Sequence, residues 1–312
     1  MVFAKVLWCG LIIYSFVKLN FMPSTGIFNK KESIKIRGRL INLSQPLVMG
    51  ILNVTPDSFY DGGRYLDEDS LLARVSQMIG EGVDILDIGA CSTRPGAEDI
   101  GLDTEMRRLL PALKIIRSFY PELILSVDTF RSQIAQTAIQ DFGVDIVNDI
   151  SAGNSDPDIL KVIARSNVPY VLMHMQGTPQ NMQQNPVYTN VVTEVVQFLA
   201  SRIVKLKEAG ICDIIVDPGF GFGKNINHNY ELLAGLDALK ILELPVLVGL
   251  SRKSMIWKVL GKSAPEALNG STALNMVALQ KGANILRVHD VAAAVETIKL
   301  FKQLYPCVPV GN

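Results

Sequence analysis

The feature that most limits the possible folds of this chain is a repeated alternation of short apolar runs with longer stretches of helical spacing. Eight runs rich in β-branched residues occur at 47–52, 84–88, 123–127, 145–147, 169–172, 213–216, 245–248 and 284–286. Each precedes a stretch whose apolar residues recur every three or four positions, at 71–79, 105–119, 134–139, 159–164, 191–208, 230–239, 264–280 and 291–301. The sequence therefore predicts eight consecutive β-α units.

Continuously apolar strands that are each followed by a helix indicate a parallel α/β sheet covered on both faces. Eight such units close into a (β/α)8 TIM barrel, which commonly needs about 250 residues, and a chain of 312 residues has room for one. An open, doubly wound sheet is the structural alternative. Ahead of the first unit, Ile34, Ile36 and Leu40 alternate with polar residues, which predicts a short β-hairpin at the bottom of the barrel.

The first residues differ in character from the rest, so we divide the chain into an apolar extension, 1–32, and a barrel domain, 33–312. Residues 6–17 are nearly all apolar and lie between Lys5 and Lys18. Three interpretations fit this segment: a start codon placed too early, with Met22 as the real start; a membrane anchor; or a cleaved signal peptide. A membrane partner is expected only in the second case.

Composition narrows the classes of partner. Apolar residues make up 48% of the chain and charged ones 19%, and 30 Lys and Arg balance 30 Asp and Glu. Neither disorder nor a nucleic-acid-binding surface is expected, and small molecules are the predicted partners. The four cysteines form no CxxC pair, which argues against a disulfide framework or a structural zinc and favours a cytoplasmic location.

Polar residues follow the predicted strands where each strand ends. Taken singly, a strand-end Asp or Asn is an ordinary turn residue or helix cap. Barrels, however, place their active sites at the carboxyl ends of the strands, so the full set predicts one site there. Its members are Asn53, Asp87, Asp128, Asn148, His174, Asp217, Ser251, Arg252, Lys253, Arg287 and His289.

Five of the connecting segments carry further chemistry. The loops at 53–63 and 91–97 are long enough to cover a substrate, and Arg94 lies among hydroxyl groups suited to an anion. Asp217 is followed by the run Pro-Gly-Phe-Gly-Phe-Gly-Lys, in which glycines permit close approach to a ligand and the phenylalanines can flank a flat ring. A strand-end carboxylate is suited to accept two N–H groups from a heterocycle. Cations ahead of the last two helices, among them Arg287 and His289, are suited to a pyrophosphate.

The chain closely resembles the dihydropteroate synthase family from about residue 37 to about residue 304. The resemblance rests on separated motifs at 50–59 (Gly-Ile-Leu-Asn-Val-Thr-Pro-Asp-Ser-Phe), 92–96 (Ser-Thr-Arg-Pro-Gly), 126–129 (Ser-Val-Asp-Thr), 148–150 (Asn-Asp-Ile), 173–177 (Met-His-Met-Gln-Gly), 217–224 (Asp-Pro-Gly-Phe-Gly-Phe-Gly-Lys), 251–254 (Ser-Arg-Lys-Ser) and 287–290 (Arg-Val-His-Asp). No single motif is specific, but together they are. The resemblance implies that the enzyme joins p-aminobenzoate to 6-hydroxymethyl-7,8-dihydropterin pyrophosphate on a TIM barrel, with release of pyrophosphate.

The resemblance also implies a role for each matching residue. The pterin would be bound by Asp128, Asn148, Met173, Asp217, Phe222, Lys253 and Arg287. The pyrophosphate would be held by Asn53 acting through Mg2+, together with Arg287 and His289. The p-aminobenzoate site would be shaped by Thr93, Arg94, Pro95 and Ser254. The residues expected to carry catalysis are Asp128, Asp217, Lys253 and Arg287, whereas Asp87 and His174 are expected to have supporting roles.

One residue departs from the family pattern, because Cys91 stands where the family often carries Glu. We expect altered packing of the second loop there rather than lost function.

Two rival functions are a pterin-binding methyltransferase with a corrinoid partner and a noncatalytic pterin-binding relative. The Ser-Thr-Arg-Pro-Gly and Arg-Val-His motifs argue against the first, and the complete set of clamp residues argues against the second. The apolar helices of the last two units favour a homodimer.

Overall fold

Eight parallel strands form a closed barrel in the computed structural model, which describes residues 31–55, 60–61, 65–91 and 100–306. Strand β3 pairs with both β6 and β12, and a parallel bridge between Val216 and Val246 joins β10 to the segment that leads into β11. The ring therefore closes in chain order, which confirms the TIM barrel and rules out the open sheet. Its strands are β3 (Leu47–Asn53), β6 (Ile85–Gly89), β7 (Ile124–Asp128), β8 (Ile146–Asp149), β9 (Tyr170–Met173), β10 (Ile214–Asp217), β11 (Leu247–Val248) and β12 (Ile285–Val288).

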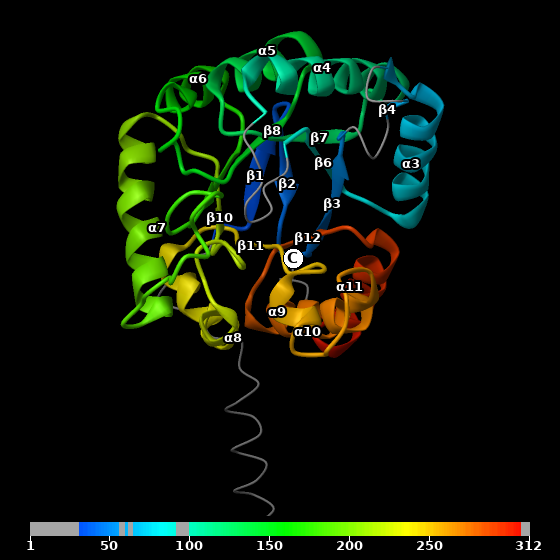
Figure 1. The fold of residues 1–312 in the computed structure, drawn as a ribbon. Helices are drawn as coiled ribbons and strands as arrows, with labels where there is room; N and C mark the ends of the chain where they lie inside the picture. The colour runs from blue at the N-terminus through cyan, green and yellow to red at the C-terminus, as the bar shows by residue number, and fades with distance from the viewer. Residues whose placement is uncertain (1–30, 56–59, 62–64, 92–99, 307–312) are drawn as a thin grey trace, which may run out of the picture. The chain divides into compact units, whose positions relative to one another are not determined.

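The helices lie around the strands, as Figure 1 shows. They are α3 (Glu68–Glu81), α4 (Leu102–Phe119), α5 (Ser132–Phe142), α6 (Asp158–Ser166), α7 (Val191–Glu208), α8 (Ile226–Ala234), α9 (Ser254–Trp257), α10 (Leu268–Lys281) and α11 (Val291–Leu304), with 3-10 helices η1 (Leu236–Leu242) and η2 (Pro265–Ala267) and a two-stranded sheet of β4 (Tyr60–Asp61) and β5 (Tyr65–Leu66). None of the helices in the described part of the chain combines the length and apolarity needed to span a membrane. The predictions for the segment at 1–30, including a start at Met22, fall outside the described residues.

Two of the predicted helices are each divided in the structure. The stretch 230–239 belongs to α8 and η1, which meet at Gly235. A Cβ at Gly235 would lie 2.8 Å from Val192 Cγ2, so glycine lets α7 approach closely where the helix breaks. The stretch 264–280 begins as η2 around Pro265 before α10 starts. Apolar spacing alone does not distinguish a continuous helix from two shorter ones.

Most of the strands extend beyond their apolar runs at the carboxyl end. Asp128 pairs with Asn148, and Asp217 pairs with Met173, so these polar residues lie inside the strands and not after them. The backbone ladder continues through them because its hydrogen bonds do not depend on the side chain. Alternate residues of a strand point to the same side, so Asp217 shares the barrel interior with Ile215, which belongs to the interior apolar cluster.

The N-terminal hairpin closes the amino-terminal end of the barrel, as predicted. Strands β1 (Ser33–Ile36) and β2 (Arg39–Asn42) pair antiparallel. Arg37 and Gly38 connect them with positive φ angles of 48° and 78°, as a type I′ turn requires. Ile34 and Ile36 are buried in the same cluster as interior residues from the barrel strands. The hairpin therefore plugs the barrel with apolar side chains.

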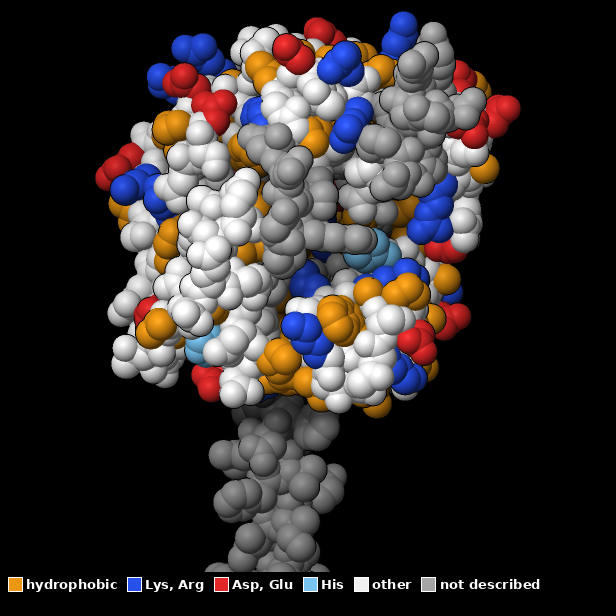
Figure 2. All heavy atoms as spheres, viewed as in Figure 1, with side chains coloured by type: hydrophobic (Ala, Val, Ile, Leu, Met, Phe, Trp, Pro, Cys, Tyr) orange, Lys and Arg blue, Asp and Glu red, His pale blue; other side chains and the backbone are white. Residues whose placement is uncertain are grey.

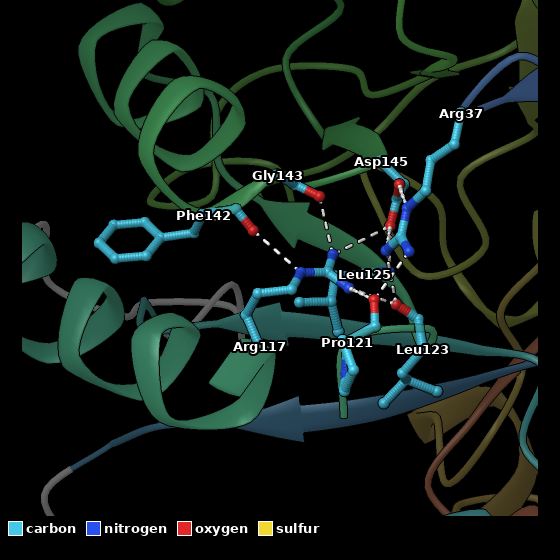
Figure 3. A network of polar contacts seen from close by, with 8 residues as sticks. All are labelled: Arg37, Arg117, Pro121, Leu123, Leu125, Phe142, Gly143 and Asp145. Carbon is cyan, nitrogen blue, oxygen red and sulfur yellow. Dashed lines mark hydrogen bonds and ion pairs between the residues drawn. The ribbon is translucent and has the colours of Figure 1, made fainter. Parts of the chain in front are cut away.

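An ion-pair network fastens the hairpin to the barrel (Figure 3). Arg37 donates to both carboxylate oxygens of Asp145, at 2.6 and 2.9 Å, and Arg117 donates to the same carboxylate at 3.1 Å. A cavity of about 570 Å³ lies beside them, and all three residues line it. Because Asp145 immediately precedes β8, this cavity lies at the amino-terminal end of the strands, away from the predicted active site.

Candidate active site

Arg287 lies at the centre of a polar network inside the carboxyl end of the barrel. Its Nε donates to Asp87 Oδ2 at 2.6 Å, and its Nη2 donates to Asp128 Oδ2 at 2.7 Å. The Asn148 amide donates to the same Asp87 oxygen at 2.9 Å. The network joins β6, β7, β8 and β12, and it brings together three of the predicted pterin residues with Asp87.

Burial sets the electrostatics of this network. Asp87 is fully buried, and its second carboxylate oxygen accepts no hydrogen bond from the described residues; the same holds for the Ser126 hydroxyl. Burial raises the pKa of Asp128 to about 7, although Arg287 opposes the shift. Burial alone would lower the pKa of Arg287, but the carboxylates of Asp87 and Asp128 raise it. Arg287 therefore keeps its charge, and Asp128 gains or loses its proton near neutral pH.

Asp217 ends β10 and is held by the loop that follows it. Its Oδ1 accepts a hydrogen bond from the Gly219 backbone N–H at 2.7 Å. Gly219 has a φ of 69°, and a Cβ there would lie 1.8 Å from the His174 carbonyl oxygen, so only glycine permits this close approach. Burial raises the pKa of Asp217, whereas the positive charges of Lys253 and Arg287 lower it. A hydrogen-bonding ligand at this end of the barrel would meet a buried carboxyl group of fixed orientation.

Lys253 reaches the same region from the loop after β11. Its ammonium donates to the Phe220 carbonyl oxygen and lies 4.8 Å from the centre of the Phe222 ring. Burial lowers the pKa of Lys253 to about 8. Met173, which ends β9, is also buried, and its Cγ lies 3.3 Å from the position of a Cβ on Gly219. The predicted pterin residues from β9, β10 and the β11 loop are therefore neighbours.

The residues predicted to bind pyrophosphate lie at the ends of adjacent strands. The His289 ring Nδ1 lies 3.1 Å from Ser251 Oγ, and the same hydroxyl is 3.2 Å from the His289 backbone nitrogen. On the face drawn in Figure 2, a histidine side chain (pale blue) lies right of centre beside Lys or Arg side chains (blue). Asn53 ends β3, the strand beside β12, and is half-buried.

No group of three or more His, Cys, Asp or Glu side chains is placed to hold a metal ion within the described residues. Mg2+ prefers oxygen ligands and commonly keeps several waters while it binds one or two protein groups and a substrate phosphate. The amide oxygen of Asn53 is a donor of this kind. The residues therefore fit a magnesium ion that arrives with a phosphate-bearing substrate, and they do not form a separate metal cage.

Most of the residues predicted for p-aminobenzoate lie outside the described part of the chain, namely Thr93, Arg94 and Pro95. Ser254 is described: it is the first residue of α9 and is exposed. Beside the second loop, Cys91 Sγ lies 3.3 Å from Glu105 Oε2, and Arg131 pairs with the same carboxylate. Burial raises the pKa of the Cys91 thiol to about 12, so this position is neutral.

Sequence reasoning left the roles of three buried residues unresolved. Asp87 was expected only to support the site, yet it contacts Arg287 directly. Lys224 ends the glycine-rich motif and is buried against His174, with 2.9 Å between Lys224 Nζ and His174 Nδ1. The sequence offers one signal for Lys224, which is its position after three alternating glycines. Its partners are two backbone carbonyl oxygens and the distant His174, and no local pattern of opposite charges indicates them.

Comparison with known proteins places this arrangement among characterised enzymes. Residues 49–289 match the model of the pterin binding enzyme family. The chain is 42% identical over 266 residues to the dihydropteroate synthase of Escherichia coli (strain K12), an alignment that covers 85% of this chain and 93% of that protein. The crystal structure of Yersinia pestis dihydropteroate synthase in a sulfonamide drug complex superposes with a TM-score of 0.82 at 40% identity, over 87% of this chain and 98% of that one. The Xanthomonas albilineans enzyme with 4-aminobenzoic acid superposes with a TM-score of 0.81 at 41% identity, over 89% and 99%.

Proposed function

The chain belongs to the dihydropteroate synthase family of pterin-binding enzymes, and from this premise we propose how its residues divide the reaction between them. It is a transferase of folate biosynthesis: it condenses 6-hydroxymethyl-7,8-dihydropterin pyrophosphate with p-aminobenzoate to give dihydropteroate and pyrophosphate. The observation that carries the assignment of roles is the position of Arg287 between Asp87 and Asp128, with Asp217 and Lys253 as its charged neighbours.

The pterin binds in the pocket of buried polar groups at the strand ends. Asp217 accepts hydrogen bonds from the amidine edge of the pterin, because a carboxylate matches two parallel N–H donors. Asp128 and Asn148 bind the other polar atoms of the ring, and Lys253 donates to an acceptor atom. Met173, Phe222 and the guanidinium plane of Arg287 pack around the heterocycle. The support for these roles is the shared burial and mutual contact of the residues.

The pyrophosphate binds beside the pterin, at the ends of β3 and β12. Arg287 and His289 contact its oxygens, and Asn53 would hold a Mg2+ ion through its amide oxygen. When bound, Mg2+ neutralises part of the charge that develops on the leaving group. Arg287 supplies fixed positive charge at the same place, and its two carboxylate partners hold the guanidinium in one orientation before substrate arrives.

The reaction needs no nucleophilic side chain. The attacked carbon is a methylene group next to an electron-rich ring, so departure of pyrophosphate leaves a cation that is delocalised into the pterin. The buried carboxylates of Asp128 and Asp217 stabilise that positive charge, and loops that exclude water protect the cation from hydrolysis. The amine of p-aminobenzoate then bonds to the methylene carbon and releases a proton. We assign Thr93, Arg94, Pro95 and Ser254 to the p-aminobenzoate site on the family motif.

The direct test is turnover by the purified protein. The full chain and a form that starts at Met22 are each supplied with the pterin pyrophosphate, p-aminobenzoate and Mg2+, and dihydropteroate is measured by mass spectrometry. We expect product from both forms, with loss of product when Mg2+ is chelated. Pterin binding without product in either form would instead support the noncatalytic alternative, and activity restricted to the full chain would show that residues 1–21 are needed.

The assembly and location of the protein are further parts of the proposal. We infer a homodimer formed by α10 and α11, because these helices contact each other and leave apolar side chains exposed, including Leu268, Leu300 and Leu304. We propose that the barrel domain acts in the cytoplasm. Analytical ultracentrifugation of the wild type and of Leu300→Lys tests the dimer, which the lysine is expected to dissociate.

A further inference from the structure

Lys224 is a fully buried lysine to which the reaction assigns no role. Only 2% of its surface is exposed. Its amine nitrogen lies 2.9 Å from His174 Nδ1 and donates to the carbonyl oxygens of Gly219 and Phe222, at 2.9 and 3.1 Å. These contacts can use all three hydrogens of a protonated amine, although burial lowers the pKa of Lys224 well below its usual value. A buried amine is costly unless such contacts serve the structure around it.

The segment that Lys224 organises is the one between Asp217 and Lys224, which we call the glycine loop. This loop lies in very close contact with the segment after β9: a Cβ on Gly219 would be 1.8 Å from the His174 carbonyl oxygen, and one on Gly223 would be 2.3 Å from the Gln176 carbonyl oxygen. The Lys224 amine joins both ends of the loop, through Gly219 and Phe222, to His174. One side chain therefore fastens the whole loop to the end of β9.

The glycine loop in turn determines where Lys253 lies. The Lys253 ammonium donates to the carbonyl oxygen of Phe220 and lies over the Phe222 ring. Phe222 contributes both the ring beneath Lys253 and a carbonyl oxygen that Lys224 holds. A shift of the loop would move Lys253 and the ring together, and the Asp217 carboxylate would lose its fixed partner, the Gly219 N–H.

We propose that Lys224, with His174 as its acceptor, is a positioning residue for the pterin pocket: it holds the glycine loop so that Asp217, Phe222 and Lys253 are prearranged for the pterin. Burial and the positive charge of Lys224 lower the pKa of His174 to about 3, so the His174 ring is neutral and its Nδ1 is free to accept. The inference rests on the proposed function, because it assigns the glycine loop to pterin binding.

The test is Lys224→Met in the full-length chain, because methionine keeps the length and apolar stem of lysine but cannot donate. Loss of these hydrogen bonds is expected to raise KM for the pterin pyrophosphate and to reduce kcat/KM by about 30-fold. KM for p-aminobenzoate is expected to stay within about threefold of the wild type, because the hydrogen bonds of Lys224 within the described residues go to the glycine loop and to His174. Calorimetric titration of a pterin into the variant gives the affinity independently of turnover.

Two further variants separate positioning from a general loss of structure. Tyr188→Phe removes another hydrogen bond to the same loop, from the tyrosine hydroxyl to the Gly223 carbonyl oxygen at 2.8 Å, which does not involve the residues that hold Lys253. It is expected to leave KM for the pterin nearly unchanged. His174→Asn keeps an acceptor near the Nδ1 position and is expected to retain more pterin affinity than His174→Leu.

The possible outcomes are distinct. An active wild type with unchanged pterin KM and affinity in Lys224→Met would overturn the positioning role and leave the proposed function intact. Equal losses for both substrates, accompanied by a lower melting temperature, would also overturn it, since they would show a structural role alone. An inactive wild type that binds no pterin would contradict the proposed function itself.

Discussion

Arg287 and Asp87 form a buried ion pair, with 2.6 Å between Nε and Oδ2, although 200 residues separate them in the chain. Asp87 is completely buried, whereas the Arg287 side chain is 19% exposed. The carboxylate is therefore the more deeply buried partner, and part of the Arg287 side chain stays accessible. We propose that the pair orients a positive charge for the leaving pyrophosphate before the substrate binds.

We expect Asp87→Asn to impair both folding and turnover, because it leaves the Arg287 charge buried with one carboxylate partner in place of two. Breaking a buried ion pair commonly costs about 3–5 kcal/mol, and the amide that remains reduces this to about 2–3 kcal/mol in the free energy of unfolding. Urea denaturation measures the first effect, and kcat measures the second. Unchanged kcat in a folded variant would show that Asp87 does not orient Arg287.

Asp217→Asn is expected to keep the fold but lose most activity. The amide still accepts a hydrogen bond from the Gly219 N–H, so the loop keeps its anchor. It cannot provide the negative charge for the pterin cation, and loss of one preorganised charged contact costs about 100- to 1,000-fold in kcat. The measurement is kcat, and a melting curve that matches that of the wild type shows that the fold is kept. Near-normal turnover would contradict the role given to Asp217.

The pH dependence of kcat/KM is expected to be bell-shaped, with its maximum between about pH 7 and pH 8. Asp128 must be ionised to stabilise the positive charge that develops on the pterin, and burial raises its pKa to about 7, so activity is expected to fall as pH drops below that value. Lys253 must be protonated to donate, and burial lowers its pKa to about 8, so activity falls as pH rises above it.

Lys253→Arg identifies the basic limb of that profile. Arginine stays protonated throughout the accessible range, so the variant is expected to have lower kcat/KM but no loss of activity between pH 8 and about 10. The acid limb, which belongs to Asp128, is expected to remain. A basic limb that persists unchanged in Lys253→Arg would assign it to another group.

The ion pairs of Arg37 and Arg117 with Asp145, at the amino-terminal end of the barrel, are expected to stabilise the fold without affecting the reaction. Arg37→Ala removes both hydrogen bonds from Arg37 to Asp145, although Arg117 still pairs with that carboxylate. Because Arg37 is partly exposed, the expected loss in the free energy of unfolding is about 1–2 kcal/mol. Kinetic constants for both substrates are expected to match the wild type, since the network lies at the amino-terminal end of the strands. A changed KM would indicate coupling through the barrel.

The thiol of Cys91 is expected to react slowly. Burial and the neighbouring Glu105 carboxylate raise its pKa to about 12, so little thiolate exists at pH 7. Cys212 is exposed and serves as an internal control. Peptide mapping after maleimide labelling is expected to show modification of Cys212 at least about tenfold faster than of Cys91. Comparable rates would contradict the neutral, shielded thiol seen beside Arg131.

The repeated β-α pattern predicted the barrel, with an open sheet as the alternative, and the end of the barrel where a site is expected. The apolar alternation at 34–40 predicted the hairpin. The β-α pattern failed at element boundaries. The apolar runs at 123–127 and 213–216 stopped just before Asp128 and Asp217, whereas the strands continue through these residues. A helix predicted at 230–239 is broken at Gly235, where α7 approaches. Local hydrophobic pattern reports which face is buried, and it does not report where the backbone hydrogen bonds end.

The sequence by itself determined the fold class, the family and the set of strand-end residues, because periodicity and motif spacing are local properties of a chain. Only the tertiary structure decided which of those residues touch. Closure of the barrel brings Asp87 to Arg287, and the close approach of two loops brings Lys224 to His174. Such pairs depend on strand register and on the removal of charges from water, and both arise only when distant segments pack together.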